Sequence, residues 1–551
     1  MTVAHELDVF DPGFDDRTIG ELLRQQALRL GDRPWILCGD ERLSFAEVDS
    51  LVDRYAAGLL ALNVAPGIRV GVMLENSTRF LLLALALGRI GAIYVPVNLA
   101  LKGDSLLHVL RQSGVSFLAV ESSLLGRFAS VARSLPELST VLVTDLSDTG
   151  APRDLDVDVL DFDVAVVAAP DMAVRLAASA AATFDPWCVM FTSGTTGPAK
   201  GAVMTHQYWY VVPSTLCGPA RDVRPDDVFY VSSPMFHAAA WLVQIVPSLI
   251  LGLPVAIDAR FSASQFWDRV RHYGATQLLT MGATHIWLWN QDSSEIDADN
   301  PARVWAPVPL PGELYEPFKK RFGIEHLWST YGGTEFMSVT CTDVRRAMKP
   351  GASGRARPSV ELAVLDDRGR RVPAGVVGEL CVRPIVPHAI FQGYFGMPEE
   401  TLSRFGDLWY HTGDLVRIDE DDDLFFVDRK DDYLRVRGEN VSSFDVETAF
   451  NKHPAVAEAA VFSVPSEESS LVSEDEIMVA LVQSEGANVE LTELLAFVGE
   501  QLPHFAVPRY LEFLKDLPRT PTGRVQKHIL RNRRLTPQTF DRIGAGIHIE
   551  R

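Results

Sequence analysis

The 551-residue chain has no excess of basic residues, since 51 Lys and Arg stand against 72 Asp and Glu, a formal net charge of −21 at pH 7. Proteins that bind nucleic acid usually carry a basic face, so this composition argues against a nucleic-acid partner. An anionic substrate would have to be held by local positive groups against the field of the whole molecule.

Cysteine is also scarce. The chain has five, and no two of them show Cys-x-x-Cys spacing. The odd number and the wide separation argue against a disulfide framework and against a structural zinc site. They favour a reducing compartment, so the sequence predicts a cytoplasmic protein. Its first residues are acidic and include no apolar run, so we expect no signal peptide.

Long apolar runs are missing as well. The segment 80–88 is too short to span a bilayer, and the segment 241–257 contains Gln244, Pro247 and Pro254. A membrane-spanning helix needs about 18 or more predominantly apolar residues. We therefore expect both segments to be buried in a protein core, and we expect no membrane span.

The first third of the chain alternates strand and helix patterns. Continuous apolar strands between helices predict a parallel sheet covered on both faces. We expect strands at 69–74, 93–97 and 117–120, and helices at 77–90 and 103–113. The Asp-rich segment 146–170 is typical of an irregular surface connection. A second block of strands and helices, at about 187–323, is followed by a mostly β region with strands at 361–365 and 377–382.

The composition changes at 419–432, where acidic and aromatic residues crowd together. Beyond it we expect helices at 444–452 and 491–501 and strands at 456–464 and 477–482. About 120 residues are enough for a small separate domain. The predicted fold class is therefore α/β: a large N-terminal region with parallel sheets and a β subdomain, and a small C-terminal α+β domain.

The strongest chemical signal is the run Phe-Thr-Ser-Gly-Thr-Thr-Gly-Pro-Ala-Lys-Gly at 191–201. Its glycines permit close backbone approach, its four hydroxyls can donate to oxygens, and Lys200 adds a positive charge, a combination that suits a polyphosphate. It is not a Walker A loop, because residue 199 is Ala and the segment 202–205 looks like a strand. A plain Ser/Thr/Gly hairpin loop is the alternative interpretation.

This loop is the first of six motifs that occur in the order found in one superfamily. The other five are Pro234-Met235-Phe236-His237, Tyr331-Gly332-Gly333-Thr334-Glu335, Tyr410-His411-Thr412-Gly413-Asp414, Asp428-Arg429 and the run 517–523. The sequence thus resembles the AMP-forming acyl-CoA synthetases, adenylation domains and luciferases over about residues 18–535. The run Arg-Gly-Glu-Asn-Val-Ser at 437–442 is similar to that of carnitine/crotonobetaine-type acyl-CoA ligases.

The resemblance implies a division into three parts: an N-terminal nucleotide- and acyl-binding domain at 1–430, a mobile C-terminal domain at 431–535 and a tail at 536–551. In this family the C-terminal domain turns between the two half-reactions, a domain alternation that uses a hinge, here Asp431. The family first joins a carboxylate to AMP and then transfers the acyl group to coenzyme A.

The resemblance also implies roles for single residues in nucleotide binding. Glu335 would supply an oxygen ligand to magnesium, and Asp414 would accept from the ribose hydroxyls. A solvated surface acid and a turn aspartate are the respective alternatives. The implied nucleotide-binding set is Thr192, Ser193, Gly194, Thr195, Thr196, Gly197, Lys200, Tyr331, Thr334, Asp414 and Arg429.

The acyl and coenzyme A ends carry a second set of expectations from the resemblance. His237, Gly332 and Gly333 would shape the acyl pocket, although a satisfied core histidine is an alternative for His237. Arg435, Gly438 and Asn440 would line the site in the thioester-forming arrangement, with a solvated face as the alternative for the basic residue. The aromatic residues near the expected pocket, which favour a bulky apolar acid or else an ordinary core, are Trp209, Tyr210, Trp241, Trp287 and Trp289.

The sequence departs from the family at two places. The family's Gly-Gly-Ala-Pro segment aligns with Ala-Pro-Val-Pro at 306–309. The family's catalytic lysine, which bridges carboxylate and phosphate during adenylation, aligns with Arg524. Arginine keeps the charge, but its longer, planar, forked group does not replace a point charge conservatively. We therefore take His237, Glu335 and Arg524 as the candidate catalytic residues, and we expect adenylation to suffer more than thioester formation.

The predicted function is thus an acyl-CoA ligase that works mainly from preformed acyl-AMP, releasing AMP. It would use coenzyme A, with ATP and Mg²⁺ only where adenylation occurs, and a separate ligase would supply the adenylate. This arrangement resembles the non-adenylating ligases of bacterial diterpenoid antibiotic biosynthesis, in the platensimycin and platencin pathways. The alternatives are a complete ATP-dependent synthetase, an adenylation enzyme that loads a carrier protein, and a non-catalytic acyl-adenylate binding protein.

Overall fold

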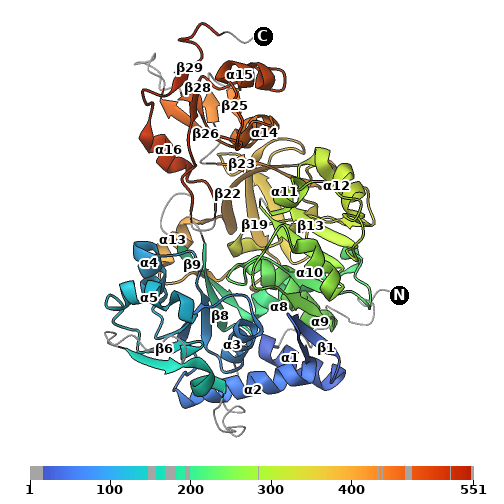
Figure 1. The fold of residues 1–551 in the computed structure, drawn as a ribbon, viewed down its shortest axis with the longest axis vertical. Helices are drawn as coiled ribbons and strands as arrows, with labels where there is room; N and C mark the ends of the chain where they lie inside the picture. The colour runs from blue at the N-terminus through green and yellow to red at the C-terminus, as the bar shows by residue number, and fades with distance from the viewer. Residues whose placement is uncertain are drawn as a thin grey trace.

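The computed structural model describes residues 17–146, 157–167, 181–192, 199–282, 284–430, 434–436, 439–465, 475–504, 506–520 and 523–547. Figure 1 shows a large N-terminal body, coloured blue to brown, and a smaller C-terminal body, coloured orange to red, stacked along the long axis. This arrangement of a large α/β body with parallel sheets and a small α+β body confirms the predicted fold class.

The N-terminal body contains an eight-stranded sheet whose middle is parallel, as the apolar strand pattern predicts. Its two antiparallel partners at one edge are β9 and β20. The order across the sheet is β20 (Gly393–Tyr394), β9 (Lys200–Thr205), β8 (Pro186–Thr192), β4 (Ile93–Pro96), β3 (Arg69–Met73), β5 (Phe117–Val120), β6 (Thr140–Val143) and β7 (Asp158–Asp161).

A seven-stranded sheet forms the second layer of this body. All its neighbours pair in parallel except β1 and β2. The order is β14 (His326–Leu327), β13 (Val304–Val308), β12 (Gln277–Met281), β10 (Phe229–Val231), β11 (Val255–Ile257), β1 (Pro34–Cys38) and β2 (Glu41–Ser44).

Helices cover these sheets and begin where the sequence supplies caps. At the start of α2 (Phe45–Ala61), Ser44 and Glu47 form a reciprocal capping box, and Ser77 caps α3 (Thr78–Arg89). The other helices of this body are α1 (Ile19–Leu30), α4 (Gly103–Ser113), α5 (Leu125–Ala132), α8 (His206–Leu216), α9 (Val246–Leu251), α10 (Phe266–Tyr273), α11 (Thr284–Trp289), α12 (Tyr315–Phe322) and α13 (Pro398–Ser403).

An antiparallel β subdomain follows, as expected, and leads towards the C-terminal body. Its strands are β18 (Val360–Leu365), β19 (Gly378–Pro384), β22 (Trp409–Ile418), β21 (Phe405–Gly406) and β23 (Leu424–Arg429). Beside it, a small sheet contains β15 (Thr330–Tyr331), β16 (Thr340–Cys341) and β17 (Arg355–Ala356).

The C-terminal body contains a four-stranded sheet flanked by helices. Its elements are β26 (Val456–Pro465), β27 (Asp475–Gln483), β28 (Tyr510–Phe513), β29 (Phe540–Asp541), α14 (Ser443–Asn451), α15 (Leu491–Gly499), α16 (Lys527–Arg533) and the hairpin β24 (Leu434–Val436) with β25 (Glu439–Val441). β29 lies in the segment that the sequence assigns to a tail, yet it pairs with β28 in this sheet.

The two bodies have separate cores. Every buried residue in two of the apolar clusters, those around Leu494 and around Tyr510, belongs to residues 434–530. The buried residues of the other clusters all lie at or before position 424. Each body therefore buries its own apolar side chains.

The structure corrects two expectations. Residues 158–167 are not irregular: they form β7 and a π-helical turn at Asp163–Val167, with Phe162 and Val166 fully buried. Trp209 and Trp241 pack against Trp187 and Tyr94 in the main core, and Trp287 is largely exposed. These tryptophans therefore give no indication of a bulky substrate.

The segment 241–257 is core, as predicted from its interruptions. It forms a π-helical turn at Ala240–Ile245 together with α9 and β11, and nearly all of its side chains are buried. No helix in the described part of the chain combines the length and the hydropathy needed to cross a membrane.

Candidate active site

The two ends of the Ser/Thr/Gly loop are anchored on neighbouring antiparallel strands. Thr192 ends β8 and Lys200 begins β9, and they are register partners. The strand after the loop confirms that it does not lead into a helix as a Walker A loop does. Ser193, Gly194, Thr195, Thr196 and Gly197 lie outside the described residues.

Lys200 contacts two groups on the far side of this sheet edge. Its ammonium group pairs with Glu400 on α13 and lies 5.4 Å from the centroid of the Tyr394 ring on β20. β20 is hydrogen-bonded to β9, and this pairing brings the 390s next to the loop. In this arrangement a protein carboxylate already neutralises the lysine charge.

The segment that follows β15 is held in one backbone shape by tight packing. A Cβ on Gly332 would lie 2.4 Å from the backbone nitrogen of Ser338 and 2.6 Å from the carbonyl oxygen of Phe336, so only glycine fits there. The phenol of Tyr208 donates to the Thr334 carbonyl at 2.9 Å and accepts from the backbone N–H of Met337 at 3.0 Å. A Cβ on Gly333 would lie 3.0 Å from the Phe336 ring.

Glu335 sits at the point where this segment meets the 390s. The hydroxyl of Tyr394 donates to its carboxylate at 2.8 Å, and the backbone N–H of Phe391 donates to its carbonyl at 2.8 Å. The carboxylate is half-buried, so one oxygen remains for another ligand. A single carboxylate fits a magnesium ion that is otherwise bound by phosphate oxygens and water.

Asp414 is a buried carboxylate on β22, with only 2% of its surface exposed. The Tyr331 hydroxyl donates to it, and Arg429, its register partner on β23, places Nε 2.8 Å from the other carboxylate oxygen. Burial raises the pKa of Asp414, and the Arg429 charge opposes that rise. The motif residues Tyr331, Asp414 and Arg429, which are distant in sequence, are thus in direct contact.

Arg524 reaches this group from the C-terminal body, from the segment between β28 and α16. Burial among the surrounding protein atoms lowers the pKa of its guanidinium, as does the charge of Arg429, whereas Asp414 and Glu335 raise it. Arg524 nevertheless keeps an exposed surface. The same guanidinium helps to lower the pKa of His237, for which burial is the larger cause, to about 4. His237 is therefore neutral at physiological pH.

The structure thus brings together His237, Tyr331, Glu335, Asp414, Arg429 and Arg524, with Lys200 joined to Glu335 through Tyr394. Two carboxylates and several cations gathered in one place can hold a hydroxylated, phosphate-bearing ligand. Asp431 and Gly438 lie outside the described residues, and so do the side chains of Arg435 and Asn440, whose backbones pair in the β24–β25 hairpin.

Sequence reasoning missed Tyr394 and Glu400. Both act through the pairing of β20 with β9, which joins positions almost two hundred residues apart. No local spacing marks such a contact, so the sequence contains no signal for it beyond a Gly-Tyr dipeptide followed by a short helix.

Comparison with known proteins identifies the family. Residues 23–395 match the family described as AMP-binding enzyme, and residues 445–524 match the AMP-binding enzyme C-terminal domain. A crotonobetaine/carnitine–CoA ligase of Salmonella paratyphi C is 29% identical over 498 residues, covering 89% of this chain and 93% of the relative.

Solved structures show the same fold. The o-succinylbenzoate coenzyme A synthetase of Bacillus subtilis in complex with AMP has a TM-score of 0.80 at 23% identity, covering 94% of this chain and 99% of that one. The anthranilate CoA ligase AuaEII in complex with anthranoyl-AMP has a TM-score of 0.82 at 22% identity, covering 96% and 98%. The family match spans more than half of the sequence, and the chain belongs to the AMP-binding enzymes.

Proposed function

We propose that the protein is an acyl-CoA ligase that forms a thioester between coenzyme A and an apolar carboxylic acid, and that it works mainly on preformed acyl-adenylate. The observation that carries the proposal is Arg524, which stands beside His237, Asp414 and Glu335 where a lysine would act in adenylation. The ligase names of the relatives support the reaction class.

In the proposed step the coenzyme A thiol loses its proton to solvent water and its sulfur attacks the acyl carbonyl carbon of the adenylate. A carbon–sulfur bond forms, the bond between that carbon and the phosphate oxygen breaks, and AMP leaves with the electron pair. Asp414 and Arg429 hold the ribose, which adenylate and AMP share. The neutral His237 imidazole adds no positive charge to the acyl side of the cleft.

Adenylation is the step that this site would perform poorly. It requires a positive point charge that bridges the carboxylate and the α-phosphate while ATP loses pyrophosphate. Glu335 would hold the Mg²⁺ ion, which would offset the phosphate charge. A guanidinium is longer and forked, and a misplacement of about 1 Å can cost about a hundredfold in rate. A second ligase would then supply the adenylate, as the resemblance to the platensimycin and platencin pathways suggests.

The acid is proposed to be apolar and bulky, in the diterpenoid class. The support is an apolar cluster against which Met337, directly after the Thr334–Phe336 turn, packs. Its buried members include Ala239, Val243 and Ala306, and Val308 packs beside them. The acyl group is proposed to lie beside this cluster, where the side chains at 239 and 306 are small.

The deciding experiment compares two reactions of the wild-type protein by mass spectrometry of acyl-CoA. One contains a panel of bulky apolar acids with ATP, Mg²⁺ and coenzyme A, and the other contains the matching synthetic adenylates with coenzyme A. We expect product at least a hundredfold faster from the adenylates. Equal rates would instead establish a complete ATP-dependent synthetase.

Two further outcomes distinguish the remaining alternatives. Acyl transfer to a phosphopantetheinyl carrier protein but not to free coenzyme A would indicate a carrier-loading enzyme. Tight adenylate binding without any transfer would indicate a binding protein.

We predict that Arg524→Lys gains adenylation. The shorter point charge would reach the α-phosphate, so ATP–pyrophosphate exchange should rise by at least tenfold, while the rate from synthetic adenylate changes less than threefold. The matched control is Arg519→Lys, in the same segment, whose guanidinium pairs with Glu458. If ATP–pyrophosphate exchange does not rise, the cause of the poor adenylation lies elsewhere. The Ala-Pro segment at 306–307 is then the next position to change.

A further inference from the structure

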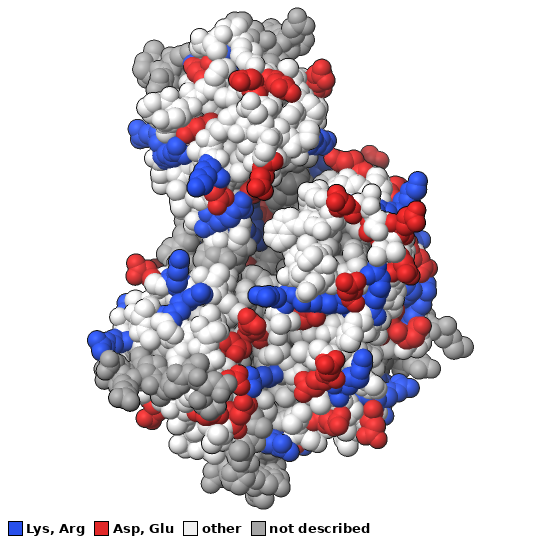
Figure 2. All heavy atoms as spheres, in the orientation of Figure 1, with Lys and Arg blue, Asp and Glu red and all other residues white. Residues whose placement is uncertain are grey.

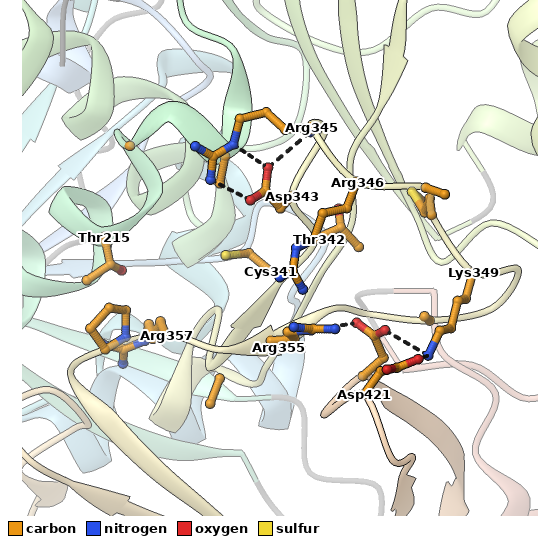
Figure 3. A pocket seen from close by; sticks show the side chains of 18 of the residues that line it. Thr215, Cys341, Thr342, Asp343, Arg345, Arg346, Lys349, Arg355, Arg357 and Asp421 are labelled. Carbon is orange, nitrogen blue, oxygen red and sulfur yellow. Dashed lines mark hydrogen bonds and ion pairs between the residues drawn. The ribbon is translucent and has the colours of Figure 1, made fainter. Parts of the chain in front are cut away.

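A cavity lies apart from the candidate active site, and none of the candidate site residues that the structure describes lines it. It has a volume of about 940 Å³ and lies between the end of α8, the segment 341–349, β17 and the turn between β22 and β23 (Figure 3). This volume is at the upper end of the range for small-molecule sites, roughly 300–1,000 Å³. Its size alone would admit a ligand with a ring system.

The charged lining of this cavity is unbalanced in favour of cations. Five basic and three acidic residues line it, in a chain whose overall charge is −21. The acids are already paired: Arg345 binds Asp343 through two nitrogens, Lys349 contacts Asp421 at 2.6 Å, and Arg355 lies 3.5 Å from Asp423 (Figure 3). The other two cations are Arg346 and Arg357, and no ion pair between described residues includes either of them.

Arg357 is the unusual member of this lining, because only 1% of its surface is exposed. Its Nη1 donates to Ser359 and its Nη2 donates to the Ala389 carbonyl at 2.5 Å, but its buried Nε has no hydrogen-bond partner among the described residues. Burial lowers the pKa of the guanidinium to about 10. A buried charge without an opposite charge is costly, so an anionic partner would stabilise this one.

Arg221, close by in the same fold, shows what a satisfied buried arginine looks like. It is also 1% exposed, but its Nε, Nη1 and Nη2 donate to Gln277, Val243 and Gln244 at 3.1, 2.6 and 2.8 Å. The rings of Phe229 and Trp328 lie 4.8 and 5.1 Å from its guanidinium carbon. Arg221 needs no ligand, whereas in the described part of the chain Arg357 has neither a third hydrogen-bond partner nor an aromatic face.

We propose that this cavity binds a small organic anion, a carboxylate or phosphate group on an apolar body, with Arg357 as the buried counter-charge. The apolar body would lie against Ala220, Met348, Ala352 and Pro358, which line the same space. Arg346 at the rim would attract the anion against the negative field of the molecule. The site is distinct from the one proposed to bind adenylate and does not depend on it.

The direct test is a crystal of the full chain, grown with AMP and soaked in 4-bromobenzoate, whose bromine is located by anomalous scattering. We expect a bromine peak in the cavity with the carboxylate directed towards Arg357. A peak only in the cleft beside His237, or none, would overturn the proposal. Calorimetry with phenyl phosphate and with inorganic phosphate then separates an anion on an apolar body from a free anion, and 4-bromobenzamide is the neutral control that should not bind.

Two variants make the proposal falsifiable even if one of them fails to fold. Arg357→Met keeps the length and removes the charge, and we expect affinity for 4-bromobenzoate to fall at least tenfold. Ala347→Glu, at an exposed rim position, adds a repelling charge without disturbing the core and should weaken binding at least threefold. Arg368→Gln, on an exposed turn away from the cavity, is the control. Binding that neither Arg357→Met nor Ala347→Glu weakens would overturn the assignment.

Discussion

Asp414 is held between a tyrosine hydroxyl and a guanidinium on a neighbouring strand, so its charge has two fixed partners before any ligand arrives. Asp414→Asn keeps the shape but removes the negative charge that faces Arg429 and that would accept from the ribose hydroxyls. Hydrogen bonds to a charged group contribute about 1.5–3 kcal/mol, which corresponds to about 10- to 100-fold in affinity. We expect calorimetry to show this loss of affinity for an acyl-sulfamoyl-adenosine, a stable analogue of the acyl-adenylate. Asp366→Asn, on an exposed turn, is the control, and an unchanged affinity for Asp414→Asn would refute the ribose assignment.

The low pKa of His237 leads to a prediction about how the rate of thioester formation depends on pH. Burial, aided by the charge of Arg524, lowers its pKa to about 4, so the imidazole stays neutral from pH 5 upward. The rate of thioester formation should therefore show no inflection near pH 6.5. Its rate should rise towards the thiol pKa of about 8.5, because the thiolate is the nucleophile.

The measurement is kcat/KM for coenzyme A at saturating adenylate between pH 5.5 and 9. His237→Asn should keep the shape of this profile even if its height changes. An inflection between pH 6 and 7 that disappears in His237→Asn would show that the imidazole titrates in the reaction.

At the scale of elements, an ion pair between β9 and α13 would compete with a phosphate group for the Lys200 charge. Lys200 pairs with Glu400, and Arg404, one turn further along, lies 3.6 Å from the same carboxylate. We predict that Glu400→Gln, in an Arg524→Lys background, raises ATP–pyrophosphate exchange by up to about fivefold, because partly exposed ion pairs are worth about 0–1 kcal/mol. Glu399→Gln, on the exposed side of the same helix, should have no effect. A decrease with Glu400→Gln would mean that Glu400 positions Lys200 productively.

The elements themselves divide into those that the sequence could predict and those that it could not. β5 and α4 have the predicted bounds, because an unbroken apolar strand and an amphipathic helix have strong local patterns. β7 was missed because it is an edge strand with partly exposed, Asp-rich residues, which look like a loop.

The same distinction holds in the candidate site. Asp414, Tyr331 and Glu335 lie in compact motifs, so their residue types and spacing could be read from the chain. Tyr394 and Glu400 could not, since only the pairing of β20 with β9 gives them neighbours. Arg357 has no distinguishing pattern in the sequence, because the partners of a side chain depend on its three-dimensional surroundings.

At the scale of the whole molecule, the distribution of charge matters to ligands that are anions. In the view of Figure 2, acidic side chains are spread widely over the lower and right parts of the N-terminal body, while several basic ones lie around the junction of the two bodies. Arg524 belongs to the upper body and Asp414 to the lower one. The candidate site is therefore complete only in this relative arrangement, and a turn of the C-terminal body would remove Arg524 from it.

The separate apolar cores have a consequence for how the protein melts. Two bodies that share no core need not unfold together, so calorimetry of the unliganded chain should show two transitions rather than one. A bound adenylate that contacts both Asp414 and Arg524 would stabilise the folded, joined arrangement of the two bodies. The stabilisation is about 2.7 kcal/mol at a ligand concentration a hundred times Kd. Because the ligand couples the two bodies, their transitions should move closer together. AMP, which lacks the acyl group, should draw them together less. A single transition in the absence of ligand would show instead that the interface alone makes the two bodies one cooperative unit.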